Sequence, residues 1–245
     1  MINFNFLQEI RKFELQRAIA HIPPGSHLLE LGAGAGWQSK WLSEAGFIVS
    51  AIDLDNTEYL THQEYPVVVY DGVHIPFPDA HFDFVFSSNV MEHVLDLTTM
   101  HSEIYRVLKP DGIALHILPS TAWRFWTSLT HPLEVLRQQY LFSRSAFLKQ
   151  PLAVLRALLS DPFPPRHGER GNTTTELYFF SSLFWHRNFQ RNGFSILLSQ
   201  PVGLFYTGHF LKSAAWPIAL RQKLARIMGS ACRLYLLKKA PTPKP

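Results

Sequence analysis

The stretch Leu28–Trp37 most constrains the fold of this 245-residue chain, because it joins a short apolar run to three closely spaced glycines. It reads LLELGAGAGW, and apolar residues return at helical spacing after it. This order predicts a buried strand, a tight turn and a helix. Gly32, Gly34 and Gly36 lack a Cβ, so the backbone can turn sharply and a ligand can lie against it. The following helix would point its free N–H groups and positive dipole end at that ligand.

The acid before the loop separates two kinds of glycine-rich site. A dinucleotide fingerprint is G-x-G-x-x-G, which would need a third glycine at Trp37, whereas the chain has Gly36 one residue earlier. Glu30 would repel a pyrophosphate, and a buried charge needs a partner. A ligand with an amino-acid end and a sulfonium suits this E-x-G-x-G-x-G pattern better. A nicotinamide oxidoreductase stays open as a minor alternative, which tighter binding of NAD would establish.

Strand and helix patterns alternate along the first half of the chain. Strands are expected at 28–31, 47–52, 67–70, 82–88 and 113–118, helices at 4–20, 37–45 and 97–108, and a sharp turn at 109–112. Fully apolar strands in this order predict a parallel sheet covered on both faces, which is the doubly wound α/β class. Ligands on such sheets bind beyond the carboxyl ends of the strands. Glu30, Asp53, Asp71 and the segment 88–93 are expected on that rim.

Asp53 is the candidate ribose ligand. It ends the second strand 21 residues after Gly32, close to the spacing at which an acid meets a ribose diol. Asp55 is the neighbouring alternative, and an Asp at a strand end is also a common helix cap. The preceding glycine loop favours ribose binding by Asp53.

Several ordered segments then carry a family resemblance. They are Leu28–Gly36, Ala51–Asp55, Asp71 through Asp79, Phe82-Asp83 and Val107–Gly112. Residues 28–118 resemble the class I S-adenosylmethionine (SAM) dependent methyltransferases, and among them the family often called type 11. The resemblance implies a seven-stranded, mostly parallel, Rossmann-like sheet whose last strand runs antiparallel. It also implies an enzyme that moves a methyl group from SAM to an oxygen, nitrogen or carbon of a small-molecule or lipid-precursor acceptor. A SAM-binding module without catalysis is the alternative.

The resemblance also assigns a cofactor site. Glu30 and the glycine loop, with Gly32, Ala33, Gly34 and Gly36, would hold the methionine end. Asp53 and Leu54 would lie at the ribose, and Asp71 with the Gly72 backbone would read the adenine edge. Ser88 completes the predicted set.

His93 is the predicted catalytic residue. It follows the fourth strand beside the expected methyl position, and its ordinary pKa suits a general base. The alternative is a histidine that buttresses the following helix, and Glu92 is a weaker candidate for the base. No metal site is predicted, because Asn89 stands where the acid-and-histidine sites of a few O-methyltransferases would have a carboxylate.

The segment 119–175 interrupts the pattern and is too long for a plain loop. It predicts an inserted helical cap over the cofactor rim, within a single domain over 1–245, with helices at 133–142 and from Pro151. Arg124, Arg166 and His167 are the predicted substrate contacts. Trp123, Phe125 and Trp126 would line an apolar acceptor pocket or pack the cap on the domain. Beyond it we expect a helix at 180–192, a strand at 194–198, a helix after Pro217 and a final strand at 231–237.

Charge is unevenly distributed along the chain. Up to Leu118 there are 6 Lys/Arg and 15 Asp/Glu, and beyond it there are 17 and 4. This asymmetry favours an anionic partner for the second half, either an anionic acceptor or a membrane. RNA methylation is less favoured, because no dense Lys/Arg run occurs.

A membrane surface is the more specific prediction. Basic residues accompany apolar stripes in the second half, as is typical of helices that lie in a lipid interface. The residues are Arg137, Arg144, Lys149 and Arg156 with Leu133, Leu136, Phe142, Phe147, Leu148, Leu152 and Leu155, then Lys212, Arg221, Lys223, Arg226, Arg233, Lys238 and Lys239 with Trp216, Leu220, Leu224 and Ile227. The alternative is that these stripes face the protein core.

Cysteine content and hydropathy indicate in which cellular compartment the protein is expected. Cys232 is the single cysteine, so the chain has no disulfide framework and no thiolate metal cluster. No run of about 18 apolar residues occurs, and the N-terminus lacks the basic start and cleavage site of a signal peptide. A cytoplasmic protein is expected, with peripheral attachment to the inner membrane face as the option that the basic half raises.

Overall fold

The computed structural model describes residues 4–55, 62–142, 151–160, 162–209 and 216–241. In this part of the chain seven strands form one open sheet in the order β3-β2-β1-β4-β5-β7-β6. Pairing is parallel from β3 to β5, and β7 runs antiparallel to both β5 and β6. The strands are β1 (His27–Leu31), β2 (Ile48–Asp53), β3 (Val68–Val69), β4 (Phe82–Ser88), β5 (Leu108–Pro119), β6 (Phe194–Pro201) and β7 (Cys232–Lys239). The predicted doubly wound, Rossmann-like sheet is confirmed.

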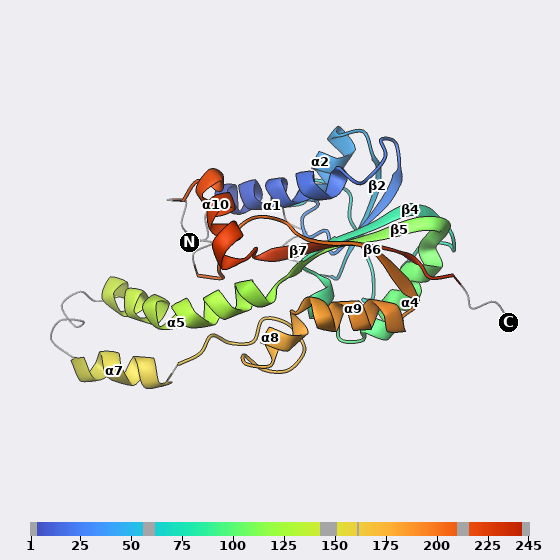
Figure 1. Ribbon diagram of the computed structural model, residues 1–245. Coiled ribbons are helices and arrows are strands. Elements are labelled where there is room, and N and C mark those ends of the chain that lie inside the picture. The colour runs from blue at the N-terminus through green and yellow to red at the C-terminus, as the bar shows by residue number, and fades with distance from the viewer. Residues whose placement is uncertain (1–3, 56–61, 143–150, 161, 210–215, 242–245) are drawn as a thin grey trace.

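Helices cover both faces of this sheet (Figure 1). The helices α1 (Phe4–Ile19) and α2 (Trp37–Glu44) lie over one face, and α4 (Leu97–Val107) and α9 (Ser182–Arg191) over the other. The remaining helices are α5 (Thr121–Phe142), α7 (Pro151–Ser160), the short α8 (Glu176–Phe179), α10 (Ile218–Met228) and a 3-10 turn at Met91–His93. Among the described helices, none combines the length and apolar character that crossing a bilayer requires.

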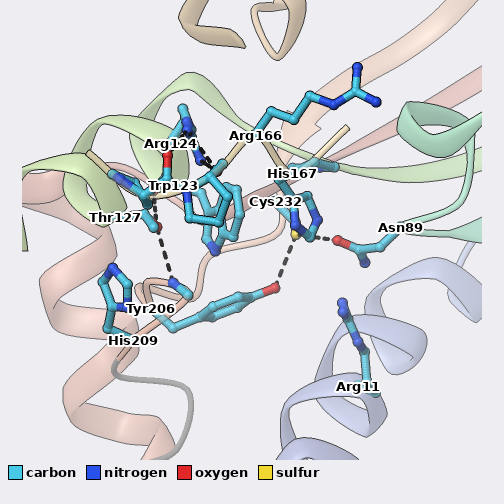
Figure 2. Close-up of a pocket in the computed structure, with 14 residues that line it drawn as sticks. Arg11, Asn89, Trp123, Arg124, Thr127, Arg166, His167, Tyr206, His209 and Cys232 are labelled. Atoms are coloured by element: carbon cyan, nitrogen blue, oxygen red, sulfur yellow. Dashed lines mark hydrogen bonds between the residues drawn. The ribbon is translucent and has the colours of Figure 1, made fainter. Parts of the chain in front are cut away.

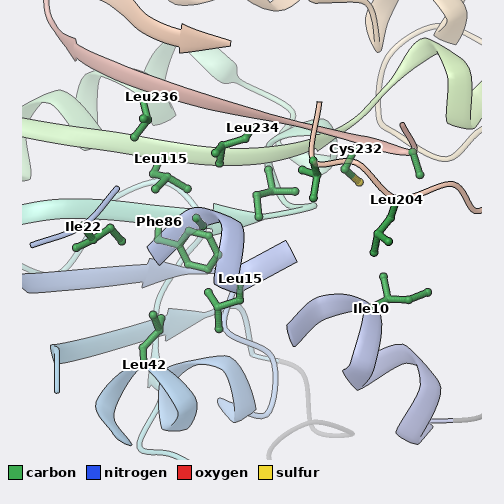
Figure 3. Packing of buried hydrophobic residues seen from close by; sticks show 14 of the residues in the cluster. Ile10, Leu15, Ile22, Leu42, Phe86, Leu115, Leu204, Cys232, Leu234 and Leu236 are labelled. Atoms are coloured by element: carbon green, nitrogen blue, oxygen red, sulfur yellow. The ribbon is translucent and has the colours of Figure 1, made fainter. Parts of the chain in front are cut away.

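The alternation of buried strand residues explains the two layers. Leu28 and Phe86 pack with Ile10 of α1 in one core cluster, part of which Figure 3 shows. Leu29 and Val85 point the other way into the second cluster, with α4 and α9. Successive strand side chains alternate between faces, so a strand that is apolar at every position must be covered twice. The continuous apolar runs therefore produce a three-layer domain.

Local signals place α4. The Asp96 side chain accepts hydrogen bonds from the N–H groups of Thr98 and Thr99, at 3.0 and 3.1 Å, and caps the helix. Met100 and Ile104 lie one turn apart on the same face and are buried against the sheet. The helix ends at Val107, where β5 begins at once.

The start of β5 contains the predicted turn. The segment 109–112 folds back on itself, since a Cβ on Gly112 would lie 3.0 Å from the N and O atoms of Lys109, but β5 already begins at Leu108 and the turn is a bulge within the strand. Phe82 pairs with Leu108 and Phe84 with Ile113, so these four residues lie opposite Asp83 alone. Lys109 Nζ contacts Asp83 Oδ1 at 2.7 Å, which holds the bulge to β4.

The second half departs more from its prediction. Helix α5 begins at Thr121 rather than at 133 and continues through Pro132, while α7 begins at Pro151 as predicted. Both helices extend away from the sheet (Figure 1), and the loop 162–175 lies between them and the rim. Of the residues in the membrane prediction, Arg144, Phe147, Leu148, Lys149 and Lys212 lie outside the described residues.

Candidate active site

A cavity of about 540 Å³ opens at the glycine loop. Its wall combines the loop, the start of α2, the end of β2 and the inner side of α1. The lining residues include Gly32, Ala33, Gly34, Gln38 and Asp53. Four of these residues, Gly32, Ala33, Gly34 and Asp53, were predicted to bind the cofactor, and the strand ends bring them into one wall. Gln38 was not predicted.

The three glycines of the loop, Gly32, Gly34 and Gly36, differ in what surrounds them. All are in the left-handed region, with φ of 75°, 58° and 80° at Gly32, Gly34 and Gly36. A Cβ on Gly32 would lie 3.0 Å from Val90 Cγ1 and closer still to Cγ2, and one on Gly36 would lie 2.8 Å from Tyr65 Cβ. A Cβ on Gly34 would meet nothing within 4 Å. Gly32 and Gly36 therefore allow close packing of the loop, whereas open space adjoins Gly34 in the cavity wall.

Asp53 ties the end of β2 to the glycine loop. Its Oδ2 accepts the Gly34 N–H, and its Oδ1 accepts the Leu54 N–H at 2.6 Å. The carboxylate therefore stands in the cavity wall. Asp55 is exposed beyond it.

Glu30 lies one layer behind this wall. Its side chain is buried, and it accepts hydrogen bonds from Gln38 Nε2 at 3.0 Å and from Ser39 Oγ. Burial raises the pKa of Glu30 to about 8. The structure brings Gln38 to the cavity and uses Glu30 to orient the first turn of α2.

The environment of Glu30 predicts a pH dependence. The unfolded carboxyl titrates near its ordinary pKa, so raising the pH from 5 to 8 removes a proton from the unfolded chain first and lowers the stability of the fold. Glu30→Gln removes this titrating group, so we expect the free energy of unfolding of the variant to decline less steeply than that of the wild type between pH 5 and pH 8. The difference is at most about 1.4 kcal/mol per pH unit. Urea unfolding at pH 5, 6.5 and 8 measures it, with the exposed Glu44→Gln as control. Parallel profiles for wild type and Glu30→Gln would contradict the assignment.

The predicted adenine residues form a separate turn. The Asp71 carboxylate accepts the N–H groups of Val73 and His74, at 2.8 and 2.7 Å, and contacts His74 Nδ1 at 2.9 Å. The His74 side-chain bond and these N–H bonds lower the pKa of Asp71 to about 2. A Cβ on Gly72 would lie 2.8 Å from Leu54 Cδ2, so this turn packs beside the end of β2. Ser88 instead accepts the Asn89 side-chain amide at 3.2 Å.

A second cavity, of about 310 Å³, lies beyond the ends of β4 and β5 (Figure 2). Asn89, Trp123, Arg124, Arg166, His167, Tyr206, His209 and Cys232 help to line it. Arg11 of α1 lines both this cavity and the glycine-loop cavity. The two cavities therefore lie next to each other and share one lining side chain. Sequence reasoning missed Arg11, because it reads as an ordinary polar residue on an amphipathic helix.

A chain of hydrogen bonds crosses the floor of the second cavity. Arg11 Nη1 donates to Glu14 Oε2 at 2.7 Å, and Tyr206 Oη donates to Glu14 Oε1 at 2.7 Å. The Tyr206 hydroxyl lies 3.1 Å from Cys232 Sγ, which is 3.6 Å from Asn89 Oδ1. Asn89 has a φ of 55°, an uncommon value outside glycine. These contacts join α1, β7 and the end of β4 beside the side chain that the two cavities share.

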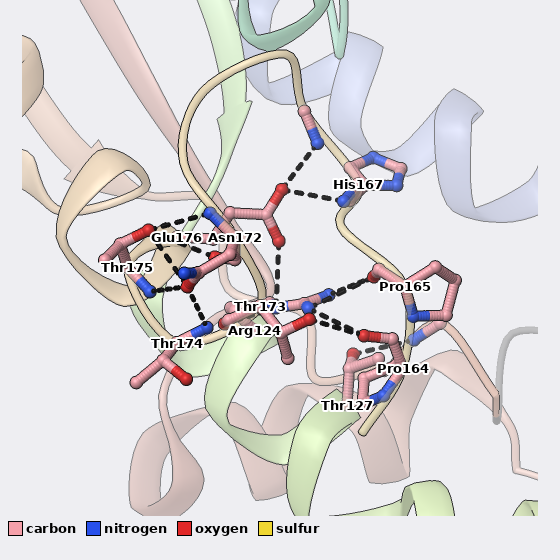
Figure 4. Close-up of polar contacts among 12 residues, drawn as sticks. Arg124, Thr127, Pro164, Pro165, His167, Asn172, Thr173, Thr174, Thr175 and Glu176 are labelled. Atoms are coloured by element: carbon pink, nitrogen blue, oxygen red, sulfur yellow. Dashed lines mark hydrogen bonds and ion pairs between the residues drawn. The ribbon is translucent and has the colours of Figure 1, made fainter. Parts of the chain in front are cut away.

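Arg124, a predicted substrate contact, instead uses its guanidinium mainly to hold together the segments that form the wall of this cavity (Figure 4). It is 1% exposed and forms an ion pair with Glu176 Oε2 at 3.0 Å. Its guanidinium also donates to backbone carbonyls of residues 164, 165 and 173. Arg166, by contrast, is half exposed and pairs with Glu169 at 2.9 Å.

His93 and His167 lie together although 74 positions separate them. Their ring centroids are 4.9 Å apart, and the centroid of the Trp123 ring lies 4.6 Å from that of His167. Partial burial lowers the pKa of both imidazoles, so both are neutral at neutral pH. The buried Glu92 lies beside them, and burial raises its pKa to about 8. Sequence reasoning named each residue but did not bring the three together.

The sequence of this region also matches a known family. Residues 29–116 fit the family model described as "Methyltransferase domain". These residues are a class I methyltransferase domain of the type 11 family. They contain the glycine loop, Asp53 and the strands β2 to β4, with most of β1 and β5.

Curated relatives share this methyltransferase domain. A malonyl-[acyl-carrier protein] O-methyltransferase of Serratia marcescens is 34% identical over 96 residues, which cover 38% of this chain and 38% of the relative. A demethylmenaquinone methyltransferase of Corynebacterium urealyticum is 33% identical over 93 residues, covering 37% of this chain and 40% of the relative. The chain therefore matches about two fifths of the length of these relatives.

Solved structures share the fold over nearly the whole chain. A chain in the complex between the Haloferax volcanii Trm112 methyltransferase activator and a putative methyltransferase superposes with a TM-score of 0.61 at 14% identity. The superposition covers 98% of this chain and 93% of that chain. At this identity the likeness concerns the fold alone.

The family uses SAM as its cofactor, and the glycine-loop cavity fits that molecule. The open space beside Gly34 lets a ligand lie against the backbone, and the Asp53 carboxylate stands in the wall to accept hydroxyl hydrogen bonds. The N-terminus of α2 faces the same loop. These residues of the methyltransferase domain would hold the cofactor.

Proposed function

We propose that this protein transfers the methyl group of SAM to an oxygen, nitrogen or carbon of a small-molecule or lipid-linked acceptor. The observation that carries the proposal is a pair of neighbouring cavities that share Arg11 in their walls, one beside the glycine loop and one lined by aromatic and polar side chains. Methyl transfer needs two ligands that touch at one point. The two relatives are named for methyl transfer to a malonyl-acyl carrier protein and to demethylmenaquinone, and these activities support a lipid-related acceptor.

The protein's contribution under this proposal is alignment. The cofactor supplies the electrophilic methyl group. The chain holds the acceptor in line with it, and orientation alone can lower a barrier by about 7–11 kcal/mol. Trp123 and the segment 164–167 would enclose the acceptor, which gives 119–175 the role of a cap. That His93 acts as a general base stays a prediction.

The charge of the second cavity is largely compensated. Arg11 pairs with Glu14, Arg124 with Glu176 and Arg166 with Glu169. A fully ionised acceptor would compete with these carboxylates, so the cavity favours an acceptor of low charge. The basic character of the second half then needs another explanation.

Two measurements test the proposed activity. Calorimetric titration with SAM and S-adenosylhomocysteine establishes cofactor binding, and incubation with fractionated metabolite and lipid extracts then measures release of S-adenosylhomocysteine. Release with one fraction supports an enzyme and leads to the acceptor. Tight binding without release from any fraction would favour a SAM-binding module, and release with bulk RNA alone would make the substrate a nucleic acid.

We expect Asp53→Ala to weaken S-adenosylhomocysteine binding about tenfold or more. A hydrogen bond to a charged group contributes about 1.5–3 kcal/mol, and the same carboxylate also supports the Gly34 N–H. Calorimetry measures the affinity, and circular dichroism confirms that the variant folds. The matched control is the exposed Asp55→Ala, which should bind normally. A loss at Asp55 instead of Asp53 would move the ribose contact there.

The exposed surface of the second half supports docking on an anionic membrane. Large apolar side chains face solvent on three helices, with Leu133 61%, Leu152 73% and Ile227 87% exposed. Arg156 is exposed on α7, and Lys223 and Arg226 are exposed on α10. Apolar side chains flanked by basic groups suit an interface of anionic lipid, where each basic group adds about 1 kcal/mol. The alternative, in which the apolar stripes face the protein core, does not hold for these three side chains, because each is more than half exposed.

Vesicle sedimentation tests this docking. We expect pelleting with phosphatidylglycerol-containing vesicles at low salt, less at high salt, and none with phosphatidylcholine alone. Leu152→Asp/Leu159→Asp should reduce pelleting severalfold, because it puts two charges among the exposed apolar side chains of α7. Leu95→Asp is the matched control, since Leu95 is 80% exposed on a loop elsewhere. Equal pelleting of both variants would contradict the surface proposed.

A further inference from the structure

Three potential metal ligands gather beside the acceptor cavity. Glu92 and His93 belong to the 3-10 turn after β4, and His167 belongs to the loop 162–175. Glu92 Oε1 lies 3.8 Å from His93 Nε2 and 4.0 Å from His167 Nε2. The donor atoms of all three residues lie within 4.8 Å of one another.

The Glu92 carboxyl group is unsatisfied. Its side chain is completely buried, and neither oxygen has a hydrogen-bond partner among the described residues. Burying such a group without a partner costs several kcal/mol. Protonation alone does not remove the cost, because a neutral carboxyl still has an O–H donor and a carbonyl acceptor to satisfy. Glu92 therefore offers two uncommitted oxygen ligands beside the two histidines.

The loop that carries His167 is fastened onto the Glu92 turn. The Glu169 N–H donates to the Glu92 carbonyl at 3.0 Å, and the Arg170 guanidinium donates to the carbonyls of Val94 and Leu95. A Cβ on Gly168 would lie 2.9 Å from the Glu92 carbonyl oxygen, so only glycine allows this approach.

A second set of contacts fixes the backbone at His167 itself. Glu176 Oε1 accepts the N–H groups of His167 and Gly168, each at 2.7 Å. The backbone at His167 is thus fixed from both sides of the loop.

We propose that Glu92, His93 and His167 bind one divalent transition-metal ion, with the remaining coordination positions open toward the acceptor cavity. Two imidazole side chains and one carboxyl side chain form a donor set suited to Zn²⁺, Mn²⁺ or Fe²⁺. Bond lengths of about 2.0–2.2 Å place ligand atoms roughly 3–3.5 Å apart, so the cluster must contract by about 1 Å. The His93 and His167 side chains are 42% and 38% exposed, which leaves room for that rotation and a path for the ion.

The site would act on the acceptor. His167 and Asn89 both line the second cavity, so an ion at the cluster would face whatever occupies it. A hydroxyl bound to a divalent ion has a lowered pKa and releases its proton to solvent more readily. This role rests on the proposed function, whereas the binding of the ion does not.

Equilibrium dialysis of the full chain tests the site. The chelator-treated protein is dialysed separately against Zn²⁺, Mn²⁺ and Co²⁺, and bound metal is counted by mass spectrometry. We expect one ion per chain, and visible absorption bands when the ion is Co²⁺. His167→Asn and His93→Asn should each weaken binding at least tenfold. His209→Asn, on the opposite wall of the same cavity, and the exposed His74→Asn are the controls and should bind normally.

The outcomes separate this inference from the methyl-transfer proposal. Less than one ion per chain with all three metals, or unchanged affinity in the His93→Asn/His167→Asn double variant, would overturn the site. The partly exposed histidines make these variants safer for folding than a change at Glu92, and circular dichroism checks them. Calorimetry with S-adenosylhomocysteine on the same samples reports on the cofactor site independently. Metal binding without cofactor binding would keep the metal site and reject the proposed activity.

Discussion

Arg124→Met is expected to lower the free energy of unfolding by about 3–5 kcal/mol. The substitution removes the cation that faces Glu176, whose side chain is completely buried, and leaves an uncompensated charge. It also strips hydrogen bonds from the backbone carbonyls of residues 164, 165 and 173. Urea unfolding followed by circular dichroism measures the loss. The segment that carries His167 should become more exposed to hydrogen exchange at the same time.

Arg166→Met is the matched control, only two residues from Arg124's carbonyl partner Pro164. Its ion pair with Glu169 is exposed, and such pairs contribute about 0–1 kcal/mol. In the double variant Arg124→Met/Glu176→Leu the orphaned charge is removed, so part of the lost stability should return. Equal, small losses in Arg124→Met and Arg166→Met would show that the buried pair does not hold the loop.

Gly32→Ala should have the second large effect, on both stability and cofactor binding. The left-handed backbone at this position costs a side chain about 1–2 kcal/mol, and overpacking against Val90 adds about 1–3 kcal/mol. Relief of the clash would displace the loop that lines the cavity, so S-adenosylhomocysteine affinity should fall at least tenfold. Urea unfolding and calorimetry measure the two effects.

Gly25→Ala separates backbone strain from the clash. Gly25 has a φ of 77°, but a Cβ there meets nothing within 4 Å, so only the strain should appear. Adding Val90→Ala to Gly32→Ala should restore part of the affinity by making room for the new methyl group. If Gly25→Ala and Gly32→Ala lost the same stability and both retained cofactor binding, close packing at Gly32 would not be the reason for the glycine.

Short-range patterns were enough to predict the sheet and its glycine loop. The period of the apolar residues determines which side chains are buried on each face, and the glycine spacing determines where the backbone can turn. Asp53 ends β2, and Gly32, Ala33 and Gly34 follow β1, so their common place in the cavity wall follows from parallel strand order. The pattern misplaced the starts of two elements, since β5 begins before the turn 109–112 and α5 begins at Thr121.

Tertiary structure alone decided the roles of the charged and polar side chains. Glu30 turned out to orient α2, Arg124 to hold a loop, and Arg11 to line two neighbouring cavities. The cluster of Glu92, His93 and His167 depends on a loop that returns to the rim 74 positions later. The burial of an apolar residue is set by its local period, because one face of an element packs against whatever covers it. The partner of a charge is a single atom, and only the assembled fold brings that atom within reach.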